Sequence, residues 1–154
     1  MKMWDGRFAK PADKLMERFN NSLPFDKELL EEDIAGSIAW AHALHTAGVL
    51  SAAESKDIVT GLKAVLKDCL DGKIEFLPTD EDIHMAVERL LTERIGEAGA
   101  RLHTGRSRND QIATDFRLHV MKRLRGIGGL VEELQKVLSA RAEAEKEVII
   151  PAYT

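Results

Sequence analysis

Residues 110–147 decide the fold, and they read DQIATDFRLHVMKRLRGIGGLVEELQKVLSARAEAEKE. Apolar side chains recur in this stretch at steps of three and four residues, which is the spacing of one face of an α-helix. They are Ile112, Phe116, Val120, Leu124, Ile127, Val131, Leu134 and Leu138. Gly126, Gly128 and Gly129 stand in the middle of this stretch. Each glycine in a helix interior destabilises the helix by about 1 kcal/mol relative to alanine. We therefore expect one long helix, or a helix interrupted near residues 126–129.

The length of this helix bears on the architecture. A helix over 110–147 spans about 57 Å at about 1.5 Å per residue. A compact chain of 154 residues measures only about 38 Å across. The chain cannot cover the whole helix by itself, and an exposed apolar stripe of that length needs partner helices. We therefore expect the protein to self-associate through a helical bundle.

Shorter helices are predicted before it. Pro11 can open the first helix, which runs to about residue 19, and a second is expected from about Asp26 to residue 47. A capping box of Ser51 and Glu54 opens a third, which stops at residue 72. A fourth is expected to be capped by Thr79 with the aspartate at position 82, and to end at residue 96.

No segment shows the alternating pattern of a run of strands. The fold class is therefore predicted to be all-α. A small N-terminal helical domain is expected over residues 1–104. The start of a central helical-bundle domain is expected over residues 105–154.

The amino-acid composition is typical of a globular protein and gives no sign of a membrane or secreted protein. The chain is 44% hydrophobic and 31% charged, which is ordinary for a soluble globular protein. No apolar run approaches the roughly 18 residues that a membrane span requires, and no secretory signal is evident. We expect a cytoplasmic protein without a membrane partner. Cys69 falls on the apolar stripe of a predicted helix, so we expect a buried structural thiol.

The sequence gives little support for a metal, cofactor or nucleic-acid site. Five histidines occur without paired cysteines or short clusters of acidic residues, so we expect neither a metal nor a cofactor. His42 and His45 share one helix at a spacing of three and are a possible ligand pair, although polarity of a helix surface explains them better. The net charge of −4, without aromatic residues between the arginines, argues against nucleic acid as a partner.

The segment that carries chemistry is residues 103–110, which reads HTGRSRND and lies where the long helix begins. Unpaired N–H groups and the macrodipole make a helix start attractive to anions. The guanidinium groups of Arg106 and Arg108 match the geometry of carboxylates. The segment predicts a socket for a small organic acid. A solvated loop in which Thr104 or Ser107 merely caps the helix is the alternative, and spacing alone leaves both open.

Residues 103–111, HTGRSRNDQ, resemble the first shared-sequence region of the argininosuccinate lyases, which belong to the fumarase/aspartase superfamily. Other stretches follow in the family's order. They are WDGRF at 4–8, FNNS at 19–22, DEDIH at 80–84 and PAYT at 151–154. Sister enzymes carry different residues where this chain has Gly-Arg-Ser-Arg at 105–108. The resemblance therefore points to this subfamily.

The resemblance implies reversible cleavage of argininosuccinate to arginine and fumarate, a step of arginine biosynthesis. A base must remove a weakly acidic proton beside a carboxylate, donors must stabilise the dianionic intermediate, and an acid must assist departure of the guanidino nitrogen. The expected partners are these small molecules and further copies of the chain. The superfamily builds each active site from several subunits of a homotetramer.

Several substrate-binding residues follow from the resemblance. Ser22, Asn109 and Thr154 match residues that contact substrate, and Ser107 and Arg108 lie beside them. Ser22 is expected at the arginine end of the substrate. Asn109 offers an amide donor where negative charge develops.

Three more positions have a structural alternative. Asp26 could pair with the cationic end of the substrate, although we favour its role as an N-cap of the following helix. His84 could orient a carboxylate or relay a proton, whereas the residues alone favour a surface histidine on a first helical turn. Thr104 could add a hydroxyl or simply cap.

No complete acid and base pair can be assembled from these residues, so no catalytic residue is expected within the chain. The resemblance places the proton-transfer histidine directly after Thr154 and a mobile serine much later. We therefore expect the 154-residue chain to be inactive by itself. The alternatives are a non-catalytic, crystallin-like helical protein of the same ancestry, or another carbon–nitrogen lyase of the superfamily.

Overall fold

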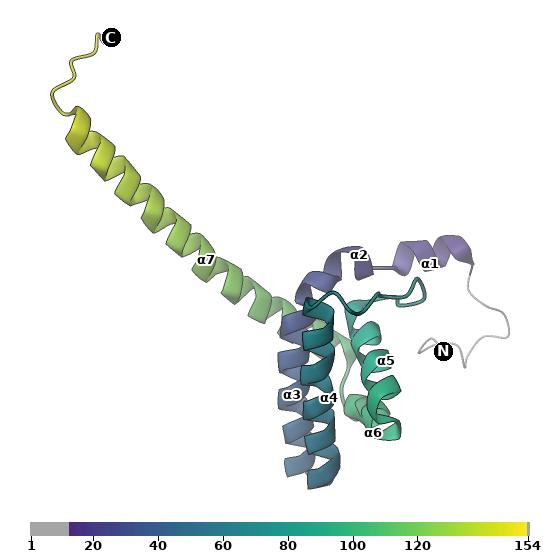
Figure 1. Ribbon diagram of the computed structural model, residues 1–154. Coiled ribbons are helices and arrows are strands. Elements are labelled where there is room, and N and C mark those ends of the chain that lie inside the picture. The colour runs from purple at the N-terminus through teal and green to yellow at the C-terminus, as the bar shows by residue number, and fades with distance from the viewer. Residues whose placement is uncertain (1–12, 154) are drawn as a thin grey trace. The chain divides into compact units, whose positions relative to one another are not determined.

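The computed structural model describes residues 13–153. These residues form α-helices and short 3-10 helices and no strand, which confirms the predicted all-α class. The elements, labelled in Figure 1, are α1 (Lys14–Asn20), α2 (Leu23–Asp26), η2 (Lys27–Leu29), α3 (Leu30–Thr46), α4 (Ala52–Leu70), α5 (Ile83–Ile95), α6 (Glu97–Ala100), η3 (Arg101–His103) and α7 (Arg108–Glu145). None of the helices is both long and apolar enough to cross a membrane, as far as the described residues go.

The chain divides into two compact units, Met1–Phe116 and Arg117–Thr154. The first unit therefore takes in the first turns of α7 together with all the shorter helices. The domain boundary expected after residue 104 stays a prediction.

Two of the predicted helix starts are wrong. The helix expected from Asp26 begins later, at Leu30, because Asp26 ends the short helix α2 and a 3-10 turn separates α2 from α3. Pro24 stands in the first turn of α2, where its fixed backbone angle suits a helix start. Thr79 does not cap α5. Asp82 does so, and its carboxylate accepts the backbone N–H of Met85 at 2.6 Å. Pro11 lies outside the described residues, and α1 begins after Asp13, which is its N-cap.

Local signals elsewhere are confirmed. Ser51 and Glu54 form the capping box of α4, with the Ser51 N–H donating to Glu54 Oε2 at 2.8 Å. Gly72 and Gly96 have positive φ angles of 68° and 71° and follow the ends of α4 and α5. A side chain at either position would strain the left-handed backbone that ends the helix.

The core of the first unit lies between α3, α4 and α5, which pack side by side (Figure 1). It contains Leu30, Ile34, Ala41, Leu44, Leu50, Ile58, Leu62, Val65, Ile83, Val87, Leu91 and Leu102. Gly61 lets α4 and α5 approach, because a Cβ at this position would lie 2.7 Å from Leu91 Cδ1. Cys69 is only partly buried at the edge of this core, and that burial raises the pKa of its thiol.

Helix α7 is continuous through its three glycines, so the interruption considered for residues 126–129 does not occur. Within the second unit its apolar side chains are exposed: 66% of Leu130 and 57% of Leu134 are accessible. The buried residues of α7 are Gln111 and Asp115, and both lie in the first unit. The helix therefore enters the core of the first unit through polar side chains, not apolar ones.

Candidate functional site

The start of α5 collects polar groups from a distant part of the chain. The backbone N–H of Ile83, which helix α5 itself leaves unpaired, donates to Asp26 Oδ1 at 3.0 Å. The hydroxyl of Ser22 donates to the other oxygen of Asp26 at 2.5 Å. The N–H of Ser22 donates to the carbonyl of Glu81 at 2.9 Å. Ser22 and Asp26 are therefore fixed together against the beginning of α5.

The interpretation of Asp26 as an N-cap of its own helix is wrong. Its side chain makes no capping bond there and instead serves the start of α5, 57 residues away. Asp26 as a whole residue is 9% exposed. Burial raises the pKa of Asp26, against the hydrogen bonds from Ser22 and Ile83, which favour its charged form.

His84 is buried, so its interpretation as a surface histidine is also wrong: 2% of it is exposed. Its Nδ1–H donates to Asp33 Oδ1 on α3 at 2.9 Å. The same nitrogen lies 3.5 Å from Asp115 Oδ2 on α7. His84, Asp33 and Asp115 thus bring α5, α3 and α7 together in one cluster.

The charges in this cluster depend on each other. Burial lowers the pKa of His84, but the hydrogen bond and the charge of Asp33 outweigh it and raise the pKa overall. Burial likewise opposes ionisation of Asp33, and the bond from His84 nevertheless lowers its pKa. Burial, followed by the charge of Asp33, raises the pKa of Asp115 to about 7. The ionised pair is therefore His84 with Asp33, while Asp115 holds a proton below neutral pH.

Unpaired oxygens agree with a proton on Asp115. Asp33 Oδ2 and both carboxyl oxygens of Asp115 are buried without a hydrogen-bond partner among the described residues. A protonated Asp115 can donate to Asp33, which gives a partner to one oxygen of each side chain.

The same three residues meet a geometric requirement for a cation site. One ligand atom from each of Asp33, His84 and Asp115 lies within 4.8 Å of the others. A positive charge already stands beside them, because the half-buried guanidinium of Arg106 interacts with both carboxyls. This neighbour disfavours a divalent cation in the cluster. His45, considered above as a ligand, contacts the carbonyl of Leu50 through Nδ1 at 3.0 Å.

Arg106 and Arg108 contact distant parts of the first unit and the first turn of α7. Arg106 Nη1 donates to Ser37 Oγ on α3 at 3.0 Å. Gly36 makes room there, since a Cβ at this position would lie 3.0 Å from Asp115 Oδ1 and 3.4 Å from Arg106 Nη2. Arg108 Nη1 donates to Gln111 Oε1 at 2.7 Å.

The guanidinium of Arg108 also lies beside the start of α5. Its Nε is 3.6 Å from Asp82 Oδ2, and its Nη2 is 3.7 Å from Glu88 Oε2. Asp82 immediately precedes Ile83 and His84. The structure therefore gathers Arg108, His84, Asp26 and Ser22 around one end of α5.

The remaining predicted site residues lie around the start of α7. Ser107 accepts the N–H of Asn109 on its hydroxyl oxygen at 3.2 Å, which makes Ser107 the cap of this helix. Asn109 is exposed on the first turn. The hydroxyl of Thr104 donates to the carbonyl of Arg101 at 2.7 Å and so closes η3. Thr154 lies outside the described residues.

Sequence reasoning missed Asp33, Gln111 and Asp115. A signal was present: Asp33 falls among Leu30, Ile34, Ala41 and Leu44, the residues of α3 that face the core. A polar residue on the apolar stripe of a helix is buried, and a buried polar residue needs a partner.

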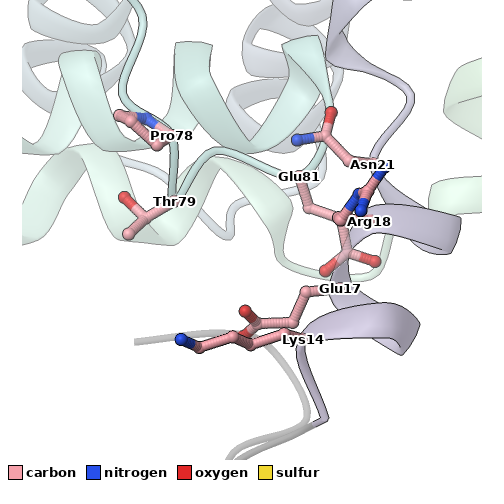
Figure 2. A pocket seen from close by; sticks show the side chains of 7 residues that line it. All are labelled: Lys14, Glu17, Arg18, Asn21, Pro78, Thr79 and Glu81. Atoms are coloured by element: carbon pink, nitrogen blue, oxygen red, sulfur yellow. The ribbon is translucent and has the colours of Figure 1, made fainter.

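Two cavities adjoin these groups. The cavity bordered by His84, Arg106 and Gln111 has a volume of about 10 Å³, enough for at most one water molecule. A cavity of about 330 Å³ lies between α1 and the segment before α5 (Figure 2). Its lining is Lys14, Glu17, Arg18, Asn21, Pro78, Thr79 and Glu81, and it includes none of the predicted substrate residues.

Comparison with known proteins gives the family. A family model described as lyase matches residues 6–154. The chain belongs to this lyase family. The lyase chain is 48% identical over 153 residues to the argininosuccinate lyase of Geobacillus sp. (strain WCH70), covering 99% of this chain and 33% of that protein. It is 50% identical over 153 residues to the argininosuccinate lyase of Chlamydomonas reinhardtii, covering 99% of this chain and 32% of that protein.

These findings confirm the resemblance inferred from residues 103–111. A third relative, the argininosuccinate lyase of Heliobacterium mobile, is 47% identical over 153 residues and gives the same coverage, 99% of this lyase chain and 33% of the relative. The lyase chain spans about one third of the length of these relatives.

Proposed function

We propose that a protein containing this chain cleaves argininosuccinate reversibly to arginine and fumarate, as a step of arginine biosynthesis. The identity of 47–50% to argininosuccinate lyases along the whole chain supports the proposal. The observation that carries it is the position of Arg108. Its guanidinium, the side-chain group that best matches a carboxylate, lies at the start of α5, where Ser22 and Asp26 are also fixed.

The fumarate half of the substrate is assigned to the start of α7. Arg108 binds a carboxylate, and Asn109 donates its amide to the charge that develops when the proton is removed. Ser107 holds the first turn of α7 so that its N–H groups add to this attraction for an anion. Thr104 precedes this turn, and Thr154 supplies a further substrate contact.

The arginine half is assigned to the start of α5. Ser22 and Asp26 are joined by a hydrogen bond and lie next to Ile83. A cationic guanidino group near Asp26 would favour the charged carboxylate and reverse the effect of burial on its pKa. His84 orients this region through Asp33 and does not itself need to exchange a proton with substrate.

In the reaction a base takes the proton beside the carboxylate, the carbon–nitrogen bond breaks, and the electron pair goes to the leaving nitrogen, which receives a proton from an acid. Asn109 stabilises the negative charge between these two steps, while Arg108 holds a substrate carboxylate throughout the reaction. We assign the base and the acid to residues beyond this chain, as the resemblance implies.

Assembly completes the site in this proposal. The exposed apolar residues of α7 in the second unit suit packing against further helices. We propose a cytoplasmic homotetramer in which neighbouring copies close the cavity.

A chimaera tests the proposal. This chain replaces the matching third of the Geobacillus argininosuccinate lyase, and release of fumarate is followed by its ultraviolet absorbance. We expect turnover, lost on Arg108→Ala and kept on Lys63→Ala, which changes an exposed residue of α4. A folded, tetrameric chimaera without turnover would refute the function. Turnover of a related succinyl compound instead of argininosuccinate would indicate another carbon–nitrogen lyase.

A further inference from the structure

Gln111 joins the candidate site to the buried cluster. Its side chain is nearly inaccessible, with 4% of the residue exposed. Its Oε1 accepts from Arg108 Nη1 at 2.7 Å, and its Nε2 donates to Asp33 Oδ1. Asp33 Oδ1 in turn accepts from His84 at 2.9 Å. A line of hydrogen bonds thus runs from the guanidinium of Arg108 into the interior of the first unit.

The chemistry of the two neighbours fixes the orientation of the Gln111 amide. A guanidinium can only donate, and an ionised carboxylate can only accept. The amide oxygen must therefore face Arg108 and the amide nitrogen must face Asp33. The opposite orientation would set two donors against each other at Arg108 and two acceptors against each other at Asp33.

Two acidic groups lie near the same guanidinium at longer distances. The acidic oxygens of Asp82 and Glu88 lie 3.6 Å and 3.7 Å from its nitrogens, against 2.7 Å for Gln111. At the shorter distance the bond constrains direction as well as position. The Gln111 amide is anchored because Asp33 is completely buried.

We propose that Gln111 is a positioning residue of the substrate site, which ties the guanidinium of Arg108 to the buried Asp33. The inference rests on the function proposed above, since it assumes that Arg108 binds a substrate carboxylate. Gln111 itself touches no substrate. Its removal would leave Arg108 able to adopt several rotamers, and part of the binding energy would go into ordering it again.

The experiment uses Gln111→Leu in the chimaera described above. Leucine has a similar size and removes both hydrogen bonds. We expect KM for argininosuccinate to rise about tenfold while kcat changes less than about twofold, because binding to a carboxylate present in both the substrate and the transition state is lost. Thr114→Ala, at an exposed position of the same helix, is the matched control and should leave both constants unchanged.

A second measurement does not depend on turnover. The 15N resonance of the Arg108 Nε–H group, assigned by its loss in Arg108→Lys, reports whether the guanidinium is held. We expect a distinct, slowly exchanging signal in the parent and in Thr114→Ala, and an averaged signal in Gln111→Leu. If Gln111→Leu does not fold, Gln111→Asn serves, because its shorter amide cannot reach both neighbours.

The outcomes separate the two proposals. With an active chimaera, an unchanged KM in the Gln111 variant overturns the positioning role and leaves the function standing. A folded, inactive chimaera overturns the function, and the resonance then decides about Gln111: an unchanged signal overturns its role and an averaged signal supports it.

Discussion

Replacing Asp115 with asparagine is expected to change how the stability of the first unit depends on pH. Asp115 is fully buried between Asp33 and His84. Its pKa is raised from 3.8 to about 7, so the folded chain holds a proton that the unfolded chain has released. Stability then falls as pH rises from about 4 through about 7. Asparagine has a similar shape and no such proton.

The size of the effect follows from the two pKa values. With 3.8 in the unfolded chain and about 7 in the folded chain, the wild type loses about 2.5 kcal/mol of unfolding free energy between pH 5 and pH 8 through this group alone. Asp115→Asn does not lose this free energy, because asparagine does not ionise. We expect the variant to resemble the wild type near pH 5 and to exceed its stability by about 2.5 kcal/mol near pH 8.

Urea unfolding followed by circular dichroism, at one fixed protein concentration across the pH range, measures the difference. Asp110→Asn is the control, because it removes an exposed carboxyl from the first turn of the same helix. Its pH profile should run parallel to that of the wild type. Parallel profiles for Asp115→Asn would refute the reasoning, since Asp115 would then not ionise in this range.

Three further substitutions test packing, capping and assembly. Gly61→Ala places a Cβ 2.7 Å from Leu91 Cδ1 and should lower the unfolding free energy by about 1–3 kcal/mol in urea; no loss would mean that α4 and α5 can move apart freely. Ser51→Ala removes the capping box of α4 and should cost about 1 kcal/mol in the same assay, and an unchanged midpoint would contradict the role of the cap. Leu134→Glu puts a charge among the exposed apolar residues of α7 and should shift the chimaera from tetramer to smaller species by light scattering, whereas a tetramer of unchanged stability would exclude this face from the interface.

Local signals in the sequence predicted local structure. The capping box of Ser51 and Glu54 is complete within four consecutive residues, and Gly72 and Gly96 end their helices by backbone geometry alone. The long helix was predictable for the same reason, because its apolar residues recur at helical spacing on both sides of the three glycines.

Residues whose partners are far away in the sequence were misjudged. Asp26 bonds to Ile83 across 57 positions, and His84 bonds to Asp33 across 51. Neither partner can be inferred from neighbouring residues, so a cap and a surface position were the natural interpretations. Asp115 and Gln111 were not predicted, because the apolar repeat of α7 suggests that its apolar residues are the buried ones. The buried residues of α7 are instead polar.

The most direct test of the account is a crystal structure of the chimaera with argininosuccinate bound, made with a variant too slow to turn over. The account predicts a substrate carboxylate about 3 Å from the guanidinium of Arg108, with the amide of Asn109 donating to the same end of the molecule and Ser22 near the other. A substrate whose carboxylates lie away from both Arg108 and Asn109 would contradict it.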